Sequence, residues 1–100
     1  MATKNRKRAE QIVERDGSDC WLCGEPMDFK AEANSDGAWS VEHLLSKDTE
    51  GRDRLENLVL CHPPCNKRLR NLTLTEKVQL RDEVRRRRWA AKVADMLAAA

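Results

Sequence analysis

Four residues in the stretch from Ser40 to Arg68 could together hydrolyse a phosphodiester bond. His43 can act as a general base, because histidine exchanges its proton near neutral pH. Its neighbour Glu42 offers a hard carboxylate oxygen of the kind that Mg²⁺ or Mn²⁺ binds. Asn57 follows fourteen residues after His43, and Asn66 follows nine residues later. These residue types predict a hydrolytic site with His43 as the base and Glu42 and Asn66 as ligands of a divalent ion.

The two asparagines have different expected roles. Asn57 stands at the start of a predicted strand, where its amide can bond across a hairpin and hold the backbone of His43 in place. Asn66 stands at the predicted start of a helix, where free N–H groups favour a phosphate. Alone, each is more often a strand-end or helix cap, and Glu42-His43 is an ordinary dipeptide whose side chains point to opposite faces unless a bulge or the strand end re-aims one. Their joint order with nearby cysteines is what indicates a site.

The four cysteines form two close pairs, Cys20 with Cys23 and Cys61 with Cys65. The N-terminal residues contain no apolar stretch of the kind that a signal peptide needs, so we expect a cytoplasmic protein. In a reducing compartment, paired thiols bind zinc more often than they form disulfides. A redox Cys-x-x-Cys motif would need a βαβ context that the sequence lacks. Gly24 can adopt the positive φ of a knuckle turn, so the sequence predicts a structural zinc site.

The fourth zinc ligand has two candidates. Cys20, Cys23 and Cys65 are the secure three. Cys61 and Cys65 are separated by three residues, whereas a knuckle usually has two, which is the spacing of His62 and Cys65. Either choice gives a tetrahedral site of a known type. We favour Cys61, because thiolate binds zinc strongly.

Composition and charge limit the class of protein. One hundred residues with 40% apolar and 36% charged content predict a single domain with a small core, which a structural metal would reinforce. No apolar run approaches the roughly 20 residues of a membrane span. The net charge of +2 hides a segregation, because residues 1–8 and 66–88 are basic whereas residues 9–56 hold thirteen acids and five bases. Basic flanks could grip a polyanion, although solvated helix faces are the alternative.

Periodicity predicts a hairpin between helices. Ala9, Ile12 and Val13 form the apolar stripe of a helix over 4–16. Residues 28–37 are expected to be a loop. A period-two pattern through His43 predicts one strand, and residues 58–60 suit a returning strand after a turn-rich loop over 48–56 around Gly51.

The C-terminal part predicts a short helix from Asn66 and then a long one. Thr73 or Thr75 is the expected cap between them. Apolar residues continue along the long helix to Trp89 and Leu97, and Trp89 is expected to be a core or interface anchor. The tract 85–88 consists of four arginines, but acids four residues earlier can pair with two of them. It is either a DNA contact or a solvated helix face.

The sequence resembles the His-Asn-His (HNH) endonuclease motif over roughly residues 18–70. The resemblance is carried by Glu42-His43, by the segment ENLVL around Asn57 and by Cys-Asn-Lys at Asn66, which stands in the place of the last His. It implies an α+β chain with a ββα-metal (His-Me finger) fold and a zinc knuckle. An N-terminal helix and a long C-terminal helix would flank it in one domain over 1–100, with a core of about 18–70 and a helical extension of about 73–98.

The resemblance also implies roles for these residues. His43 would be the general base, Asn57 would orient it, and Glu42 and Asn66 would bind Mg²⁺ or Mn²⁺, although Glu replaces the commoner Asp. The helix that opens at Asn66 would face the DNA minor groove. In similar sequences a zinc ligand often falls five residues after the asparagine, which is His62 here.

The function implied is that of a metal-dependent DNA endonuclease, a hydrolase that cuts double-stranded DNA and contains one structural Zn²⁺. Small members of this type are frequent in phages, often beside packaging genes, so phage packaging proteins are candidate partners. A rival hypothesis is a non-catalytic zinc-binding module that binds DNA with the same fold. A third is a protein-interaction domain built on the long helix with Trp89 and Leu97. The presence of all four hydrolytic residues favours the nuclease.

Overall fold

A computed structural model describes residues 3–45 and 52–100, and it confirms the α+β class. The expected turn around Gly51 lies outside these residues. The elements in chain order are α1 (Thr3–Asp16), β1 (Ser40–His43), the 3₁₀ helix η1 (Leu55–Asn57), β2 (Leu58–Cys61), α2 (Pro63–Leu69) and α3 (Leu74–Ala99).

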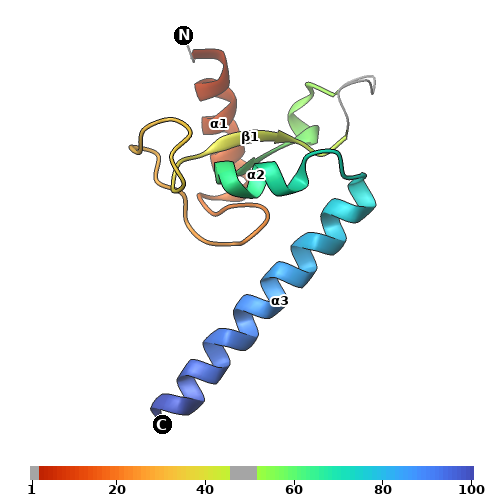
Figure 1. Ribbon diagram of the computed structural model, residues 1–100. Helices are drawn as coiled ribbons and strands as arrows, with labels where there is room; N and C mark the ends of the chain where they lie inside the picture. The colour runs from red at the N-terminus through yellow and green to blue at the C-terminus, as the bar shows by residue number, and fades with distance from the viewer. Residues whose placement is uncertain (1–2, 46–51) are drawn as a thin grey trace.

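The centre of the fold is an antiparallel hairpin followed by a helix. Ser40 pairs with Cys61 and His43 pairs with Leu58, so the register from β1 to β2 is regular. All four residues of β2 are buried, since α1 packs on β2 while α2 packs on β1. In Figure 1, α1 passes behind the hairpin and α2 crosses in front of it. The predicted ββα arrangement is therefore present.

The N-terminal helix follows its apolar stripe. Ala9 and Ile12 are buried in the core, and Val13 packs against it. The helix ends where Gly17, at a φ of 87°, donates its N–H to the carbonyl of Val13 at 2.7 Å. Arg15 in the last turn donates to the carbonyls of Leu55 and Leu58 at 2.9 and 2.8 Å. The helix thus fixes the point where η1 passes into β2.

The segment 28–37 contains only turns and bends, as its polarity predicted. It is closed by the side chains at its two ends. The rings of Phe29 and Trp39 stack with their centroids 6.4 Å apart and their planes 19° from parallel. This stacking holds the loop against the start of β1.

The short helix begins earlier than the sequence indicated. We expected it to open at Asn66, but α2 begins at Pro63, which makes Asn66 its fourth residue. Proline favours the first turn of a helix, because its fixed φ is helical and its missing N–H is not needed there. The N–H of Asn66 already donates to the carbonyl of His62 at 2.9 Å. Therefore the backbone at Asn66 is not the phosphate site that we expected.

The long helix α3 begins with a complete capping box, and Thr73 is its cap. The Thr73 hydroxyl accepts the N–H of Glu76, while the Glu76 carboxylate accepts the N–H of Thr73. The hydrogen bond to the backbone lowers the pKa of Glu76 below its usual value. Thr75 lies inside the helix.

The far half of α3 extends away from the body of the protein (Figure 1). Trp89 is 68% exposed and Leu97 is 72% exposed, so the prediction that Trp89 belongs to the core is wrong. Its role as an interface anchor stays a prediction. Among the described residues, no helix combines the length and apolar character needed to cross a membrane.

Arginine side chains hold the near half of α3 against the knuckle turn. Arg81 lies over the ring of Trp21, 4.6 Å from its centroid. Arg85 donates to the carbonyl of Trp21 at 2.7 Å and to two neighbouring carbonyls at 3.4 Å. Arg88 pairs with Glu25 at 3.2 Å. Two of the four consecutive arginines therefore dock the helix.

Replacing Thr73 with alanine should lower the free energy of unfolding by about 1 kcal/mol, because the hydroxyl that accepts the N–H of Glu76 is lost. Thr75→Ala is the matched control and should change it by less than about 0.5 kcal/mol. Urea unfolding followed by circular dichroism in excess zinc measures both. Equal losses in the two variants would contradict Thr73 as the cap.

Candidate metal centre and hydrolytic site

Four ligand atoms from two segments converge beside the knuckle turn. The sulfurs of Cys20, Cys23 and Cys65 and a ring nitrogen of His62 all lie within 4.8 Å of one another. The four cysteines are free thiols, so the alternative of two disulfides is not realised. Gly24 has the predicted positive φ, 78°, and its N–H donates to the carbonyl of Cys20 at 2.9 Å. This Cys₃His group could bind zinc.

The orientation of His62 suits a zinc ligand. Its Nε2 lies 3.0 Å from the carbonyl oxygen of Pro26, so Nε2 carries the proton and Nδ1 presents its lone pair. That Nδ1 lies 3.4 Å from the sulfur of Cys23. A tetrahedral zinc with ordinary bond lengths places a bound nitrogen and a bound sulfur about 3.6 Å apart. The spacing therefore fits one zinc ion between them.

The structure favours His62 over the predicted Cys61 as the fourth member of this group. Cys61 ends β2, and its fully buried side chain lies outside the group of four. Successive residues of an extended chain point to opposite sides, so Cys61 and His62 cannot both face the same centre. The Cys61 thiol instead donates to the sulfur of Cys20, which lowers the pKa of Cys20 and raises the pKa of Cys61. Cys61 therefore acts as a hydrogen-bond partner of Cys20, one of the candidate zinc ligands, from the side of the core.

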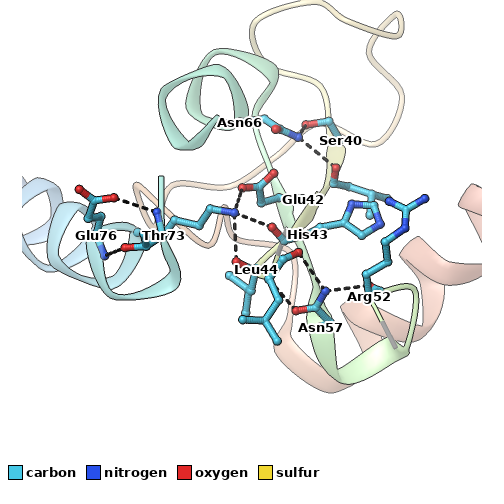
Figure 2. Close-up of polar contacts among 12 residues, drawn as sticks. Ser40, Glu42, His43, Leu44, Arg52, Asn57, Asn66, Thr73 and Glu76 are labelled. Carbon is cyan, nitrogen blue, oxygen red and sulfur yellow. Dashed lines mark hydrogen bonds and ion pairs between the residues drawn. The ribbon is translucent and has the colours of Figure 1, made fainter. Parts of the chain in front are cut away.

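Glu42 and His43 point away from each other (Figure 2). The register of β1 contains no bulge, so the two side chains keep the alternation of an ordinary strand. Glu42 is buried, whereas His43 is half-buried. His43 Nε2 lies 3.0 Å from a carboxylate oxygen of Asp53. This contact lowers the pKa of Asp53, chiefly through the hydrogen bond from His43.

Asn57 bonds across the hairpin from a buried position. Its Oδ1 accepts the N–H of Leu45 at 2.8 Å, and its Nδ2 donates to the carbonyl of Arg52 at 2.7 Å. Its own carbonyl accepts the N–H of Leu44 at 2.9 Å. The side chain therefore holds the backbone just after His43 rather than His43 itself, and it ties the two ends of the loop together (Figure 2).

Asn66 faces β1 from α2. Its Nδ2 donates to the carbonyl of Val41 at 3.0 Å and to the hydroxyl of Ser40 at 3.1 Å. Ser40 and Glu42 share one face of the strand. The helix therefore brings Asn66 over the face that carries Glu42. Both hydrogen bonds are donated by Nδ2, so Oδ1 is the atom of this amide that could bind a cation.

Lys77 of α3 meets the same strand. Its side chain is 7% exposed, and Nζ lies 3.0 Å from Oε2 of Glu42. Nζ also donates to the carbonyls of His43 and Leu44 at 2.6 and 3.1 Å. Oε2 of Glu42 is buried and receives no hydrogen bond of good geometry, so the contact with Lys77 is an ion pair alone.

A family model described as HNH endonuclease matches residues 20–72, which is more than half of the chain. The match contains the Cys₃His group, the hairpin and α2, and it excludes α1 and α3. The chain belongs to the HNH endonuclease family, whose members are generally nucleases that act on DNA. Comparison with curated proteins and with solved structures returned no match.

Sequence reasoning missed two charged residues of this region. Asp53 lies ten residues after His43 in a loop rich in charge, where no spacing rule selects it. Lys77 lies 34 residues after His43 on a helix that looked like an ordinary amphipathic extension. Leu80 and Val84, three and seven residues after Lys77, pack against the core, and this apolar stripe was the one local signal that the face of Lys77 meets the body.

The metal content of two variants tests the Cys₃His assignment. His62→Ala should lose about one zinc per chain, because three ligands hold the ion less tightly than four. Cys61→Ala should keep its zinc, since Cys61 acts from outside the group. Elemental analysis after dialysis against a weak chelator measures both. Loss from Cys61→Ala with retention in His62→Ala would contradict the assignment.

Proposed function

We propose that this protein is a metal-dependent DNA endonuclease of the HNH family, with His43 as general base and Glu42 and Asn66 as ligands of one divalent ion. The observation that carries the proposal is the placement of Asn66 over the strand face that bears Glu42, next to His43, whose ring projects from the opposite face at the strand end. The family supports a nuclease in general. The roles of single residues are our assignment.

The donor set suits a hard divalent cation. Among the described residues, a carboxylate oxygen of Glu42 lacks a hydrogen bond, and Oδ1 of Asn66 accepts none. One carboxylate and one amide oxygen, completed by water and phosphate oxygens, is the kind of site that Mg²⁺ prefers. When bound, such an ion supplies positive charge to the phosphate and to the leaving oxygen.

The contacts of His43 support a role as general base. If Nε2–H donates to the Asp53 carboxylate, Nδ1 is left to take a proton from an attacking water. Asp53 thereby selects the tautomer and stabilises the imidazolium that forms. Asn57 fixes the backbone next to this base through Leu45 and Arg52. We assign Asp53 and Asn57 as positioning residues and His43 as the catalytic residue.

One observation favours the alternative of a DNA-binding module without catalysis. Lys77 already neutralises the Glu42 carboxylate through an ion pair. A module without catalysis therefore needs no metal ion at this carboxylate. A module of this kind would keep the Cys₃His group, the hairpin and α2 while binding DNA through its basic surface. Activity measurements separate the two functions.

Plasmid nicking tests the catalytic role of His43. The zinc-loaded protein should nick supercoiled DNA with Mg²⁺ or Mn²⁺, and His43→Ala should lower the rate about 10³-fold, since a general base contributes 10²–10⁴-fold. His43 is half-buried at a strand end, so the variant should keep its zinc and its thermal midpoint. If the parent binds DNA but does not nick it, the alternative function replaces the nuclease. Equal rates in parent and variant would remove His43 as the base.

DNA binding should depend on the exposed basic residues of α2. Lys67 and Arg68 lie in its last turn, next to Asn66, where a phosphate at the hydrolytic site would be close. Lys67→Ala and Arg68→Ala should each reduce the slope of log K against log salt by about 0.9, the value for one phosphate contact. Lys92→Ala, on the far half of α3, is the control and should leave the slope unchanged. Unchanged slopes in all three variants would exclude α2 from the interface.

A further inference from the structure

Lys77 is a buried cation surrounded by oxygen atoms. The residue as a whole is 5% exposed, and lysine is almost never so buried unless it is paired. The partners of Nζ are the carboxylate of Glu42 at 3.0 Å and the carbonyls of His43 and Leu44 at 2.6 and 3.1 Å. All three oxygens belong to the end of β1, where the proposed reaction takes place.

The ammonium and a divalent ion would use the same carboxylate. Carboxylate and carbonyl oxygens are also the ligands that hard divalent cations take. The hydrogen bonds of Lys77 go to the two carbonyls, whereas Oε2 of Glu42 is held through charge alone. Two cations beside one buried carboxylate repel each other strongly at low local dielectric. This repulsion favours binding of one cation at a time at Glu42.

We propose that Lys77 competes with the divalent ion for Glu42 and so sets the metal affinity of the site. This inference rests on the proposed function, because it takes Glu42 as a ligand of the ion. Without the ion, Lys77 neutralises the buried carboxylate and donates hydrogen bonds to the carbonyls at the end of β1. Metal binding displaces the ammonium from Glu42, and the four-carbon stem of lysine lets it swing out while α3 keeps its contacts with the knuckle turn.

The geometry of α3 supports a competition that involves a side chain and not the whole helix. Arg85 and Arg88, two and three turns after Lys77, hold the helix on the knuckle through carbonyls and Glu25. Thr73 caps its start. Because these contacts do not involve Lys77, its side chain can leave Glu42 without moving the helix.

Mn²⁺ binding to the zinc-loaded protein without DNA tests the competition, with free Mn²⁺ measured by electron paramagnetic resonance. Lys77→Gln keeps an N–H donor for the carbonyls but removes the charge. It should lower the Kd for Mn²⁺ at least tenfold. Lys92→Gln changes an exposed lysine of the same helix and should leave the Kd unchanged. A Kd for Lys77→Gln equal to or above that of the parent would overturn the competition.

Glu42→Gln separates this inference from the proposed function. Loss of Mn²⁺ binding in Glu42→Gln, together with an unchanged Kd in Lys77→Gln, would overturn the competition and leave the hydrolytic site intact. Mn²⁺ binding that does not respond to Glu42→Gln would overturn the site itself.

A measurement on the parent protein covers the case in which Lys77→Gln does not fold. A buried, hydrogen-bonded ammonium exchanges slowly with water and gives a resolved ¹⁵N signal. Saturation with Mg²⁺ should remove this signal, because the displaced ammonium becomes solvated. A signal that persists at saturation would overturn the competition.

Discussion

The fold depends on the meeting of two short segments at the Cys₃His group. The turn that carries Cys20 and Cys23 comes from the N-terminal half, and His62 with Cys65 spans the passage from β2 into α2. Holding that passage fixes the end of the strand that begins next to Asn57 and the start of the helix that carries Asn66. A core whose largest fully buried side chains are Ile12 and three leucines gives a small domain little other support. A zinc ion at this group would supply it.

The long helix α3 contacts both the knuckle turn and the end of β1. Its arginines donate to backbone carbonyls of the knuckle turn, and its lysine donates to carbonyls at the end of β1. The lysine reaches carbonyl groups at the end of β1 and the arginine reaches those of the knuckle turn, which is why buried or half-buried cations recur along one face of α3. The helix therefore connects the metal-binding scaffold to Glu42. The family match ends before this helix, so the connection is a feature of this chain beyond the matched range.

Local rules predicted much of the fold, and long-range contacts explain the rest. The stripe through Ile12, the glycine turn and the threonine cap follow from spacing and residue type, and the structure has all three. The start of α2 was placed too late because the preference of Pro63 for a first turn was not weighed against Asn66. The choice between Cys61 and His62 required the end of a strand to be known to one residue. The apolar stripe around Lys77 indicated a packed helix face but not its partners, which lie 33 to 35 residues earlier in the chain.

The central claim is that Glu42 and Asn66 bind one divalent ion on a zinc-held scaffold, with Lys77 excluded when the ion is present. A crystal structure of the zinc-loaded protein soaked with Mn²⁺ tests it most directly, because anomalous scattering distinguishes the two metals. The account predicts zinc between Cys20, Cys23, His62 and Cys65. It predicts manganese bound by Glu42 and Oδ1 of Asn66, with the Lys77 ammonium moved away from the carboxylate. Manganese bound elsewhere, or bound at Glu42 with the Lys77 ion pair intact, would contradict the account.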